Sequence, residues 1–180
     1  MRRHPRPTDG FSLIELIVAV AIAGIALAFA LPSMDRLLSG SRVEAVSSEF
    51  AQALRAARTE AIKRSRPVVL CTSDAPFAGQ PACTAGSWHE GWIAYAEEDG
   101  TAGRGTTDPL LVQNGEAEPG ATWTPGPNVG ARVRFDGSGA HVLDTDAPIA
   151  DVFTLAVDGE RRRVRIAASG RVSVATVDPS

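Results

Sequence analysis

The sequence predicts an α+β fold, in which one long N-terminal helix packs on an antiparallel β-sheet or β-sandwich domain. Three observations support this prediction. Residues 11–31 form an apolar run with a single charge, residues 32–66 continue with helical periodicity, and residues 67–180 consist of short apolar runs between turn residues. The change of pattern at Pro67 therefore separates a helical part of the chain from a β-rich part.

The apolar run from Phe11 to Leu31 predicts a transmembrane helix. It contains 21 residues and one charged side chain, Glu15. A helix of this length spans roughly 31 Å, which matches the hydrocarbon core of a bilayer. By the positive-inside rule, the three arginines that precede the run place the N-terminus in the cytoplasm and the rest of the chain across the membrane.

Two other interpretations of this run are a cleaved signal peptide and a plain signal anchor. Ala28-Phe29-Ala30 offers an A-x-A cleavage site, and a basic segment precedes the run. Neither interpretation accounts for Glu15, because a carboxylate within a spanning segment costs up to about 3 kcal/mol on insertion scales and usually marks a function.

Helical periodicity resumes after Pro32 and predicts an amphipathic stem helix over residues 32–66. Pro67 ends the helix, because the residue before a proline resists the α conformation. We expect an apolar stripe on one face to pack on the β-rich domain. Its members recur at spacings of three and four residues: Val43, Val46, Phe50, Leu54, Ala57 and Ala61.

The residues after Pro67 predict a domain of antiparallel strands. Asp158-Gly159 is a strong hairpin signal, and Asp136–Gly139 and Ser169-Gly170 mark two further turns. The remainder of residues 96–130 is rich in Gly, Pro, Thr and acidic residues, which predicts long surface loops around one short strand. The expected strands are Val68–Leu70, Trp92–Tyr95, Leu110–Val112, Val133–Phe135, Val142–Leu143, Phe153–Val157, Val164–Ile166 and Val172–Val177.

Acidic residues are concentrated in the β-rich part of the chain. Residues 67–160 carry fourteen acidic residues and three arginines. Two groups have the chemistry of Ca²⁺ ligands, Glu97-Glu98-Asp99 and the pair Asp144 and Asp146, but their spacing matches no calcium-binding loop. We expect a solvated acidic surface, with no metal and no cofactor.

Cys71 and Cys83 are the only cysteines, and in an oxidising compartment we expect them to form a disulfide. For a loop of this size, the chain-entropy account gives a stabilisation of about 3 kcal/mol. A redox pair and a metal site are the alternatives. A redox pair usually has C-x-x-C spacing, and neither a second cysteine pair nor a nearby histidine supports zinc.

The sequence contains none of the common enzyme motifs that we sought. It has no G-x-S-x-G, no H-E-x-x-H, no P-loop and no Rossmann glycine pattern. His89 and His141 stand alone, and Trp88, Trp92 and Trp123 fit the role of core or loop anchors. We therefore expect a protein that is not an enzyme.

Basic residues gather near the C-terminus. Arg161, Arg163 and Arg165 alternate along one expected strand, so they share one face, and Arg171 follows in the next strand region. Because such a face can contact phosphates, these four arginines are candidate DNA contacts. The other interpretations are that they form ion pairs with the acidic part of the chain, or that they reflect a general preference for arginine, since 17 of the 18 basic residues are Arg.

The string GFSLIE at residues 10–15 resembles the processing site of type IV pilins and type II secretion pseudopilins. The resemblance implies that residues 1–10 are a leader, which prepilin peptidase removes after Gly10, and that Phe11 becomes an N-methylated N-terminus. Glu15 would then be the fifth mature residue. In the filament it would neutralise the N-terminal ammonium of a neighbouring subunit, because an unpaired buried charge is costly.

The rest of the chain resembles the GspH/FimT family of minor pseudopilins and minor type IV pilins. Three strings carry this resemblance: WHEGWI at residues 88–93, VRFDGSG at residues 133–139 and VRIAASGRVSV at residues 164–174. It implies a type IV pilin-like fold and a low-abundance subunit at or near the tip of a type II secretion pseudopilus or type IV pilus, where it supports assembly and protein secretion.

The family also implies a location and a set of partners. The chain would cross the inner membrane once, hold residues 67–180 in the periplasm, and later enter the filament. Its partners would be prepilin peptidase, other minor and major pilins or pseudopilins, the inner-membrane assembly platform and the lipid bilayer. Some FimT-like proteins bind DNA through a C-terminal G-R-x-R, but Gly170–Ser173 lacks the second arginine.

Overall fold

The computed structural model describes residues 12–98, 103–143 and 149–177, and the side chains of residues 27–36 lie outside the description. The chain divides into two compact units, residues 1–38 and residues 39–180. The described elements are α1 Leu13–Arg64, β1 Val68–Thr72, β2 Trp92–Ala96, β3 Leu110–Asn114, β4 Ala121–Pro125, β5 Arg132–Phe135, β6 His141–Val142, β7 Asp151–Val157, β8 Glu160–Ile166 and β9 Val172–Thr176.

The first unit contains the N-terminal part of α1. Its large apolar side chains between Leu13 and Ile25 are exposed, from 49% for Val18 to 75% for Leu13. The predicted start of the helix, Phe11, lies outside the described residues. A search of the described residues finds no helix whose length and hydropathy suffice to span a membrane.

The second unit is built around the C-terminal part of α1. The predicted apolar stripe is confirmed, because Val43, Phe50, Leu54, Ala57 and Ala61 are all buried. The sixth member, Val46, is partly buried and packs against the same core. The predicted end of the helix is also confirmed: α1 stops at Arg64, Ser65 takes a φ of 51°, and Pro67 follows.

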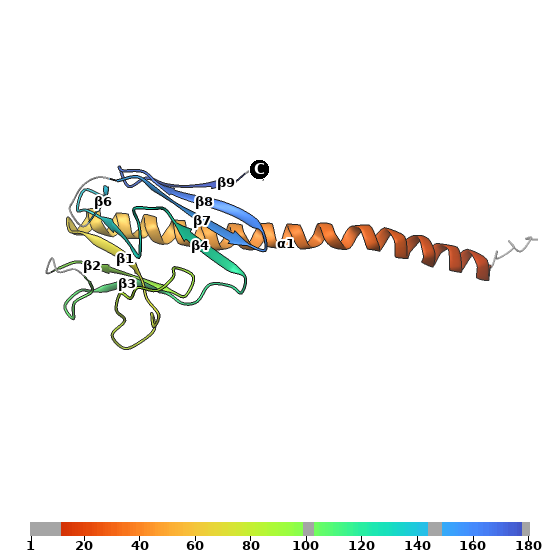
Figure 1. The fold of residues 1–180 in the computed structure, drawn as a ribbon, viewed down its shortest axis with the longest axis horizontal. Coiled ribbons are helices and arrows are strands. Elements are labelled where there is room, and N and C mark those ends of the chain that lie inside the picture. Colours follow the sequence, from red (N-terminus) through yellow and green to blue (C-terminus); the bar gives the residue numbers. More distant parts are fainter. Residues whose placement is uncertain (1–11, 99–102, 144–148, 178–180) are drawn as a thin grey trace, which may run out of the picture. The chain divides into compact units, whose positions relative to one another are not determined.

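Two antiparallel sheets cover this part of α1. The first has the strand order β3-β2-β1-β5-β6, and the second has the order β4-β7-β8-β9. Figure 1 shows β1, β2 and β3 on one side of the helix and β7, β8 and β9 on the other. Buried residues of α1 and of both sheets belong to a single hydrophobic cluster, so the helix lies between the sheets as part of the core.

Phe50 lies at the centre of this core. Its ring centroid is 4.6 Å from that of Trp123, 4.8 Å from Phe153, 5.6 Å from Trp88 and 6.0 Å from Trp92, all in edge-to-face arrangements. Trp123 and Phe153 belong to the second sheet and Trp92 to the first. The three tryptophans are core anchors, as predicted, and one helical side chain connects both sheets.

The strand β4 corrects the sequence prediction, which placed residues 121–125 in a long surface loop. These residues form an edge strand that pairs with β7. Ala121 and Trp123 are buried, whereas Thr122 and Thr124 are exposed, which is the alternation of a half-buried strand. Glycine and proline on both sides of this short run gave it the composition of a loop.

Two of the predicted turns take left-handed backbone conformations. In the β7–β8 hairpin, Asp158 and Gly159 have φ angles of 48° and 90°, as a type I′ turn requires. In the turn between β8 and β9, Gly170 has a φ of 76°. Both hairpins form where the sequence signals placed them.

The turn at residues 136–139 is organised by one carboxylate. Asp136 Oδ1 accepts hydrogen bonds from the Ser138 amide at 2.9 Å, the Ser138 hydroxyl at 2.7 Å and the Ala140 amide at 2.9 Å. Burial alone would raise the pKa of Asp136, but these hydrogen bonds stabilise the ionised form and lower its pKa below the ordinary value.

Arg58 of α1 joins this turn to the β8–β9 turn. Its Nε donates to the Gly139 carbonyl at 2.9 Å, and its Nη2 donates to the Ser169 carbonyl at 3.1 Å. Gly170 completes the contact, since a Cβ at this position would lie 1.8 Å from the Gly139 carbonyl oxygen. Glycine at position 170 therefore lets the helix and both turns approach closely.

We predict that Gly170→Ala destabilises the protein more than Gly159→Ala. Both glycines have positive φ, so each substitution costs about 1 kcal/mol of backbone strain. Only at Gly170 does the new methyl group also meet a backbone oxygen, because nothing lies within 4 Å of a Cβ at Gly159. Thermal unfolding of the two variants measures the difference, and equal losses in Tm would contradict the prediction.

Candidate functional site

The predicted processing residues lie at the N-terminal end of the chain. Gly10 and Phe11 lie outside the described residues, and Glu15 is exposed in the first turn of α1. A carboxylate is favoured at this position, because the N-terminal end of a helix carries a partial positive charge. The exposed side chains of Leu13, Ile14 and Leu16 surround it in sequence.

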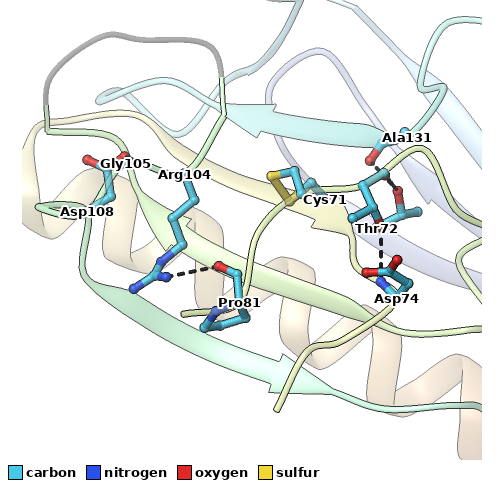
Figure 2. Close-up of a disulfide and its surroundings, with 10 residues drawn as sticks. Cys71, Thr72, Asp74, Pro81, Arg104, Gly105, Asp108 and Ala131 are labelled. Carbon is cyan, nitrogen blue, oxygen red and sulfur yellow. Dashed lines mark hydrogen bonds between the residues drawn. A yellow bond between two sulfur atoms is a disulfide. The ribbon is translucent and has the colours of Figure 1, made fainter. Parts of the chain in front are cut away.

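Cys71 and Cys83 form the expected disulfide, with an S–S distance of 2.06 Å (Figure 2). Cys71 lies on β1 and is buried in a second hydrophobic cluster with Val69, Ile93 and Tyr95. Because side chains alternate along a strand, this cluster lies on the face of the first sheet opposite α1. The loop that contains Cys83 covers that face.

Hydrogen bonds also fasten this loop at several points. The Thr84 amide donates to the Thr72 carbonyl at 2.8 Å, and the Asp74 amide donates to the Thr84 hydroxyl at 3.0 Å. Figure 2 shows Arg104 from a second loop donating to the Pro81 carbonyl, at 2.9 Å. The covalent bridge and these contacts together fix the loop against the sheet.

We predict that replacing both cysteines by alanine lowers the free energy of unfolding by about 3 kcal/mol, because the unfolded chain regains the freedom of the closed loop. Alanine is chosen because Cys71 is buried. Denaturant unfolding with and without reductant measures the effect. Reductant should destabilise the wild-type chain and leave the stability of the double variant unchanged. Equal stability of the two proteins without reductant would contradict a stabilising disulfide.

The acidic groups considered as calcium ligands have other contacts where they are described. Glu97 pairs with Arg134 at 3.1 Å in a largely buried contact, and Glu98 pairs with Arg66 at 3.5 Å on the surface. The other members, Asp99, Asp144 and Asp146, lie outside the described residues. Within the described ranges, no group of three His, Cys, Asp or Glu side chains is placed to hold a metal ion.

His141 is a buried histidine on β6. It lines a cavity of about 290 Å³ together with Arg132 and Arg134. Burial lowers the pKa of the imidazole below 6.5, while the backbone contact at Ile149 and the charge of Asp151 act in the opposite direction. The lowered pKa favours the neutral form of the imidazole.

The arginine face of the second sheet forms as predicted. Arg161, Arg163 and Arg165 are exposed on one side of β8, whereas Val164 and Ile166 are buried on the other. Arg171 is also exposed, and the residue pairing of β8 with β9 places it on the same side, beyond Ser173. We refer to these four arginines as the arginine face.

The neighbouring positions on this side of the sheet carry no charge. The described part of the chain has no ion pair between a carboxylate and any of the four arginines. The residues that share their side are uncharged, and all but one valine are alanine or hydroxylated: Thr122, Thr124, Val152, Thr154, Ala156, Ser173 and Ala175.

Arg162 differs from its neighbours and was not singled out from the sequence. Its Nε lies 2.8 Å from Glu44 Oε2 on α1, on the opposite side of β8 from the arginine face. The alternative considered for the C-terminal arginines is pairing with the acidic residues of 67–160, whereas Arg162 pairs with a carboxylate of the stem helix. Glu44 and Arg162 are 118 residues apart, so no local pattern could have connected them.

Two protein-family models match the chain. The family described as type II transport protein GspH matches residues 46–170. The chain belongs to the GspH family. The prokaryotic N-terminal methylation motif matches residues 6–31, so the predicted resemblance to minor pseudopilins and minor pilins is confirmed. Proteins of these pilin and pseudopilin families are structural, non-enzymatic subunits, and they undergo prepilin processing and associate with one another.

Two solved structures share the fold. The type IV minor pilin FimU of Pseudomonas aeruginosa has a TM-score of 0.56 and 15% identity, over 75% of this chain and 89% of FimU. The minor pseudopilin EpsH from the Type 2 Secretion System of Vibrio cholerae has a TM-score of 0.50 and 12% identity, over 77% of this chain and 99% of EpsH. No curated protein matches the chain. These similarities confirm the predicted α+β, type IV pilin-like fold.

Proposed function

We propose that this chain is a minor subunit of a type II secretion pseudopilus or of a type IV pilus. One observation carries the proposal: a single chain combines the N-terminal methylation motif at residues 6–31 with a GspH-family region at residues 46–170. The core supports it, because Phe50 of α1 contacts both sheets, so the domain is firmly attached to the stem helix that enters the filament.

In this proposal, prepilin peptidase removes the leader, residues 1–10, by cleavage after Gly10, and Phe11 becomes N-methylated. Residues 11–31 first anchor the chain in the lipid bilayer of the inner membrane, with the N-terminus in the cytoplasm. The exposed apolar side chains from Leu13 to Ile25 support this step, since such a surface is unfavourable in water. The disulfide supports a periplasmic location for residues 67–180.

Assembly then transfers the helix from the bilayer to a bundle of subunit helices. Glu15 pairs there with the Phe11 ammonium of a neighbouring subunit, because both charges would otherwise be buried without compensation. The partners in this step are other minor and major pilins or pseudopilins and the inner-membrane assembly platform. The subunit occupies a position at or near the filament tip, from which it supports assembly and protein secretion.

We predict that Glu15→Ala is processed normally but enters filaments at least about tenfold less than the wild-type chain, the effect of losing roughly 1.4 kcal/mol of pairing energy. Glu15→Asp is the control that keeps the charge, and it should retain more incorporation than Glu15→Ala. Intact mass of the membrane-extracted protein measures processing, and immunoblots of sheared filaments measure incorporation.

Three results would each contradict a part of the proposal. A mature N-terminus near Leu31, or retention of residues 1–10 in cells that contain the peptidase, would exclude prepilin processing. Normal incorporation of Glu15→Ala would exclude the charge pair and leave the processing step intact.

A second candidate function is DNA binding, as in FimT-like minor pilins that act in natural transformation. The arginine face favours it, since four cationic side chains are exposed on one side of the sheet without a carboxylate at the neighbouring described positions. The affinity that such phosphate contacts supply depends on the salt concentration and not on the DNA sequence.

If DNA is the ligand, we predict that the affinity of the detergent-solubilised full chain for a DNA oligonucleotide falls steeply with salt. Arg163→Ala and Arg171→Ala should each weaken binding by about two- to tenfold and reduce the salt dependence. Arg162→Ala is the matched control, because Arg162 pairs with Glu44 on the opposite side of β8. Fluorescence anisotropy measures all three, and an affinity that neither Arg163→Ala nor Arg171→Ala changes would exclude this function.

A further inference from the structure

The strand β9 lies at the open edge of the second sheet. It pairs with β8 on one side, and in the part of the chain that the structure describes no strand pairs with its other side. Figure 1 shows β9 as the outermost strand of this sheet, next to the C-terminus. Its five residues, VSVAT, are uncharged, and three of them are β-branched, so the strand has a high β-propensity.

The other described edges carry features that discourage strand pairing. β4 ends in Pro125, and β6 is only two residues long. β3 follows Pro109 and has a register irregularity against β2 at Ala94 and Tyr95. Proteins use prolines, bulges, charges and short strands to block unwanted pairing at sheet edges. Within Val172–Thr176, β9 has no proline, no bulge and no charged residue. Arg171 and a hydrogen bond from Arg55 to the Val172 carbonyl lie at its N-terminal end, so apart from this carbonyl the edge is open to a further strand.

The hydrogen bonds of the β8–β9 turn show which backbone groups face that edge. The Ala167 amide donates to the Arg171 carbonyl at 3.0 Å, so the ladder bonds recur at every second residue from Arg171. The N–H and C=O groups of Ser173 and Ala175 therefore face β8, where they lie opposite Arg165 and Arg163. The amide of Val172 and the N–H and C=O groups of Val174 and Thr176 point to the open edge, whereas the Val172 carbonyl accepts a hydrogen bond from Arg55 Nη2 of α1 at 3.4 Å.

The arginine face borders this edge. Arg163 and Arg165 lie opposite Ala175 and Ser173, two small residues that leave the space above β9 clear. Strands lie about 4.8 Å apart, so an added strand would be about 10 Å from β8, near the reach of an arginine side chain together with a carboxylate side chain from the added strand. Because the side chains beside this uncharged edge are cationic, an added strand with acidic side chains would be favoured.

We propose that β9 is a docking edge for an extended, acidic peptide segment of a neighbouring filament subunit. The segment adds a fifth strand beside β9, and its carboxylates lie over Arg163 and Arg165. This inference rests on the proposed role as a filament subunit and names the chemistry of its partner. A row of peptide N–H and C=O groups at strand spacing recognises another strand, whereas DNA makes no use of it, so the edge favours a peptide.

The first test is amide hydrogen exchange of the full-length chain in detergent micelles, with a synthetic peptide of alternating valine and glutamate as the probe. The amides of Val172, Val174 and Thr176 should exchange at least about tenfold more slowly with the peptide bound. Those of Ser173 and Ala175 should not change, since they already bond to β8. Unchanged exchange at all five positions would overturn the proposal.

Matched variants test each part of the recognition. Val174→Pro removes an edge N–H and should weaken peptide binding about fivefold relative to Val174→Ala, which loses the same packing but keeps the donor. The double variant Arg163→Glu/Arg165→Glu should bind a valine–lysine peptide in place of the valine–glutamate peptide. Circular dichroism confirms that the compared variants are folded. Equal binding by Val174→Pro and Val174→Ala would overturn strand addition.

The DNA alternative and the filament proposal have separate outcomes. Binding of a DNA oligonucleotide without protection of Val172, Val174 and Thr176, and without peptide binding, would overturn the docking edge. Filament incorporation of the wild-type chain is measured in parallel. Normal incorporation with no peptide-dependent protection rejects the docking edge alone, whereas absence of incorporation rejects the filament role itself.

Discussion

Burial of the apolar stripe of α1 is the constraint on which the rest of the second unit depends. The helix and the two sheets share one hydrophobic core, because buried residues from all three belong to the same cluster. Phe50 contacts aromatic side chains of both sheets. At the periphery of this core, Arg58 donates to the Gly139 carbonyl, and Glu44 forms an ion pair with Arg162. Without the helix, each sheet would expose its inner apolar face, so the part of α1 in the second unit and both sheets depend on one shared core.

Much of this arrangement could be predicted from local patterns. The stripe from Val43 to Ala61, the end of the helix before Pro67 and the turn at Asp158-Gly159 follow from spacing and backbone preference alone. The strand at residues 121–125 could not be predicted in the same way, since its flanking glycines and prolines are typical of loops. Its burial depends on Trp123 meeting Phe50, a contact between residues distant in sequence.

The candidate sites also divide into those that follow from local sequence and those that depend on residues distant in sequence. The processing motif at residues 10–15 and the alternation of Arg161, Arg163 and Arg165 are patterns of neighbouring residues, so they could be recognised in the sequence. The roles of Arg162 and Gly170 are not local: one depends on Glu44 of α1, and the other on the Gly139 carbonyl. The uncharged edge strand β9 also has meaning only once the strand order is known.

The two faces of the first sheet are under different packing constraints. One face packs against the stem helix, where nearly any change of volume disturbs a core shared by three elements. The other is covered by a loop that is held at its two ends by Cys71 and Cys83 and otherwise by hydrogen bonds at Thr72, Thr84 and Pro81. The exposed side chains between the two cysteines can therefore change without altering the helix contact. Related subunits can share one stem architecture and still present different outer surfaces to their surroundings.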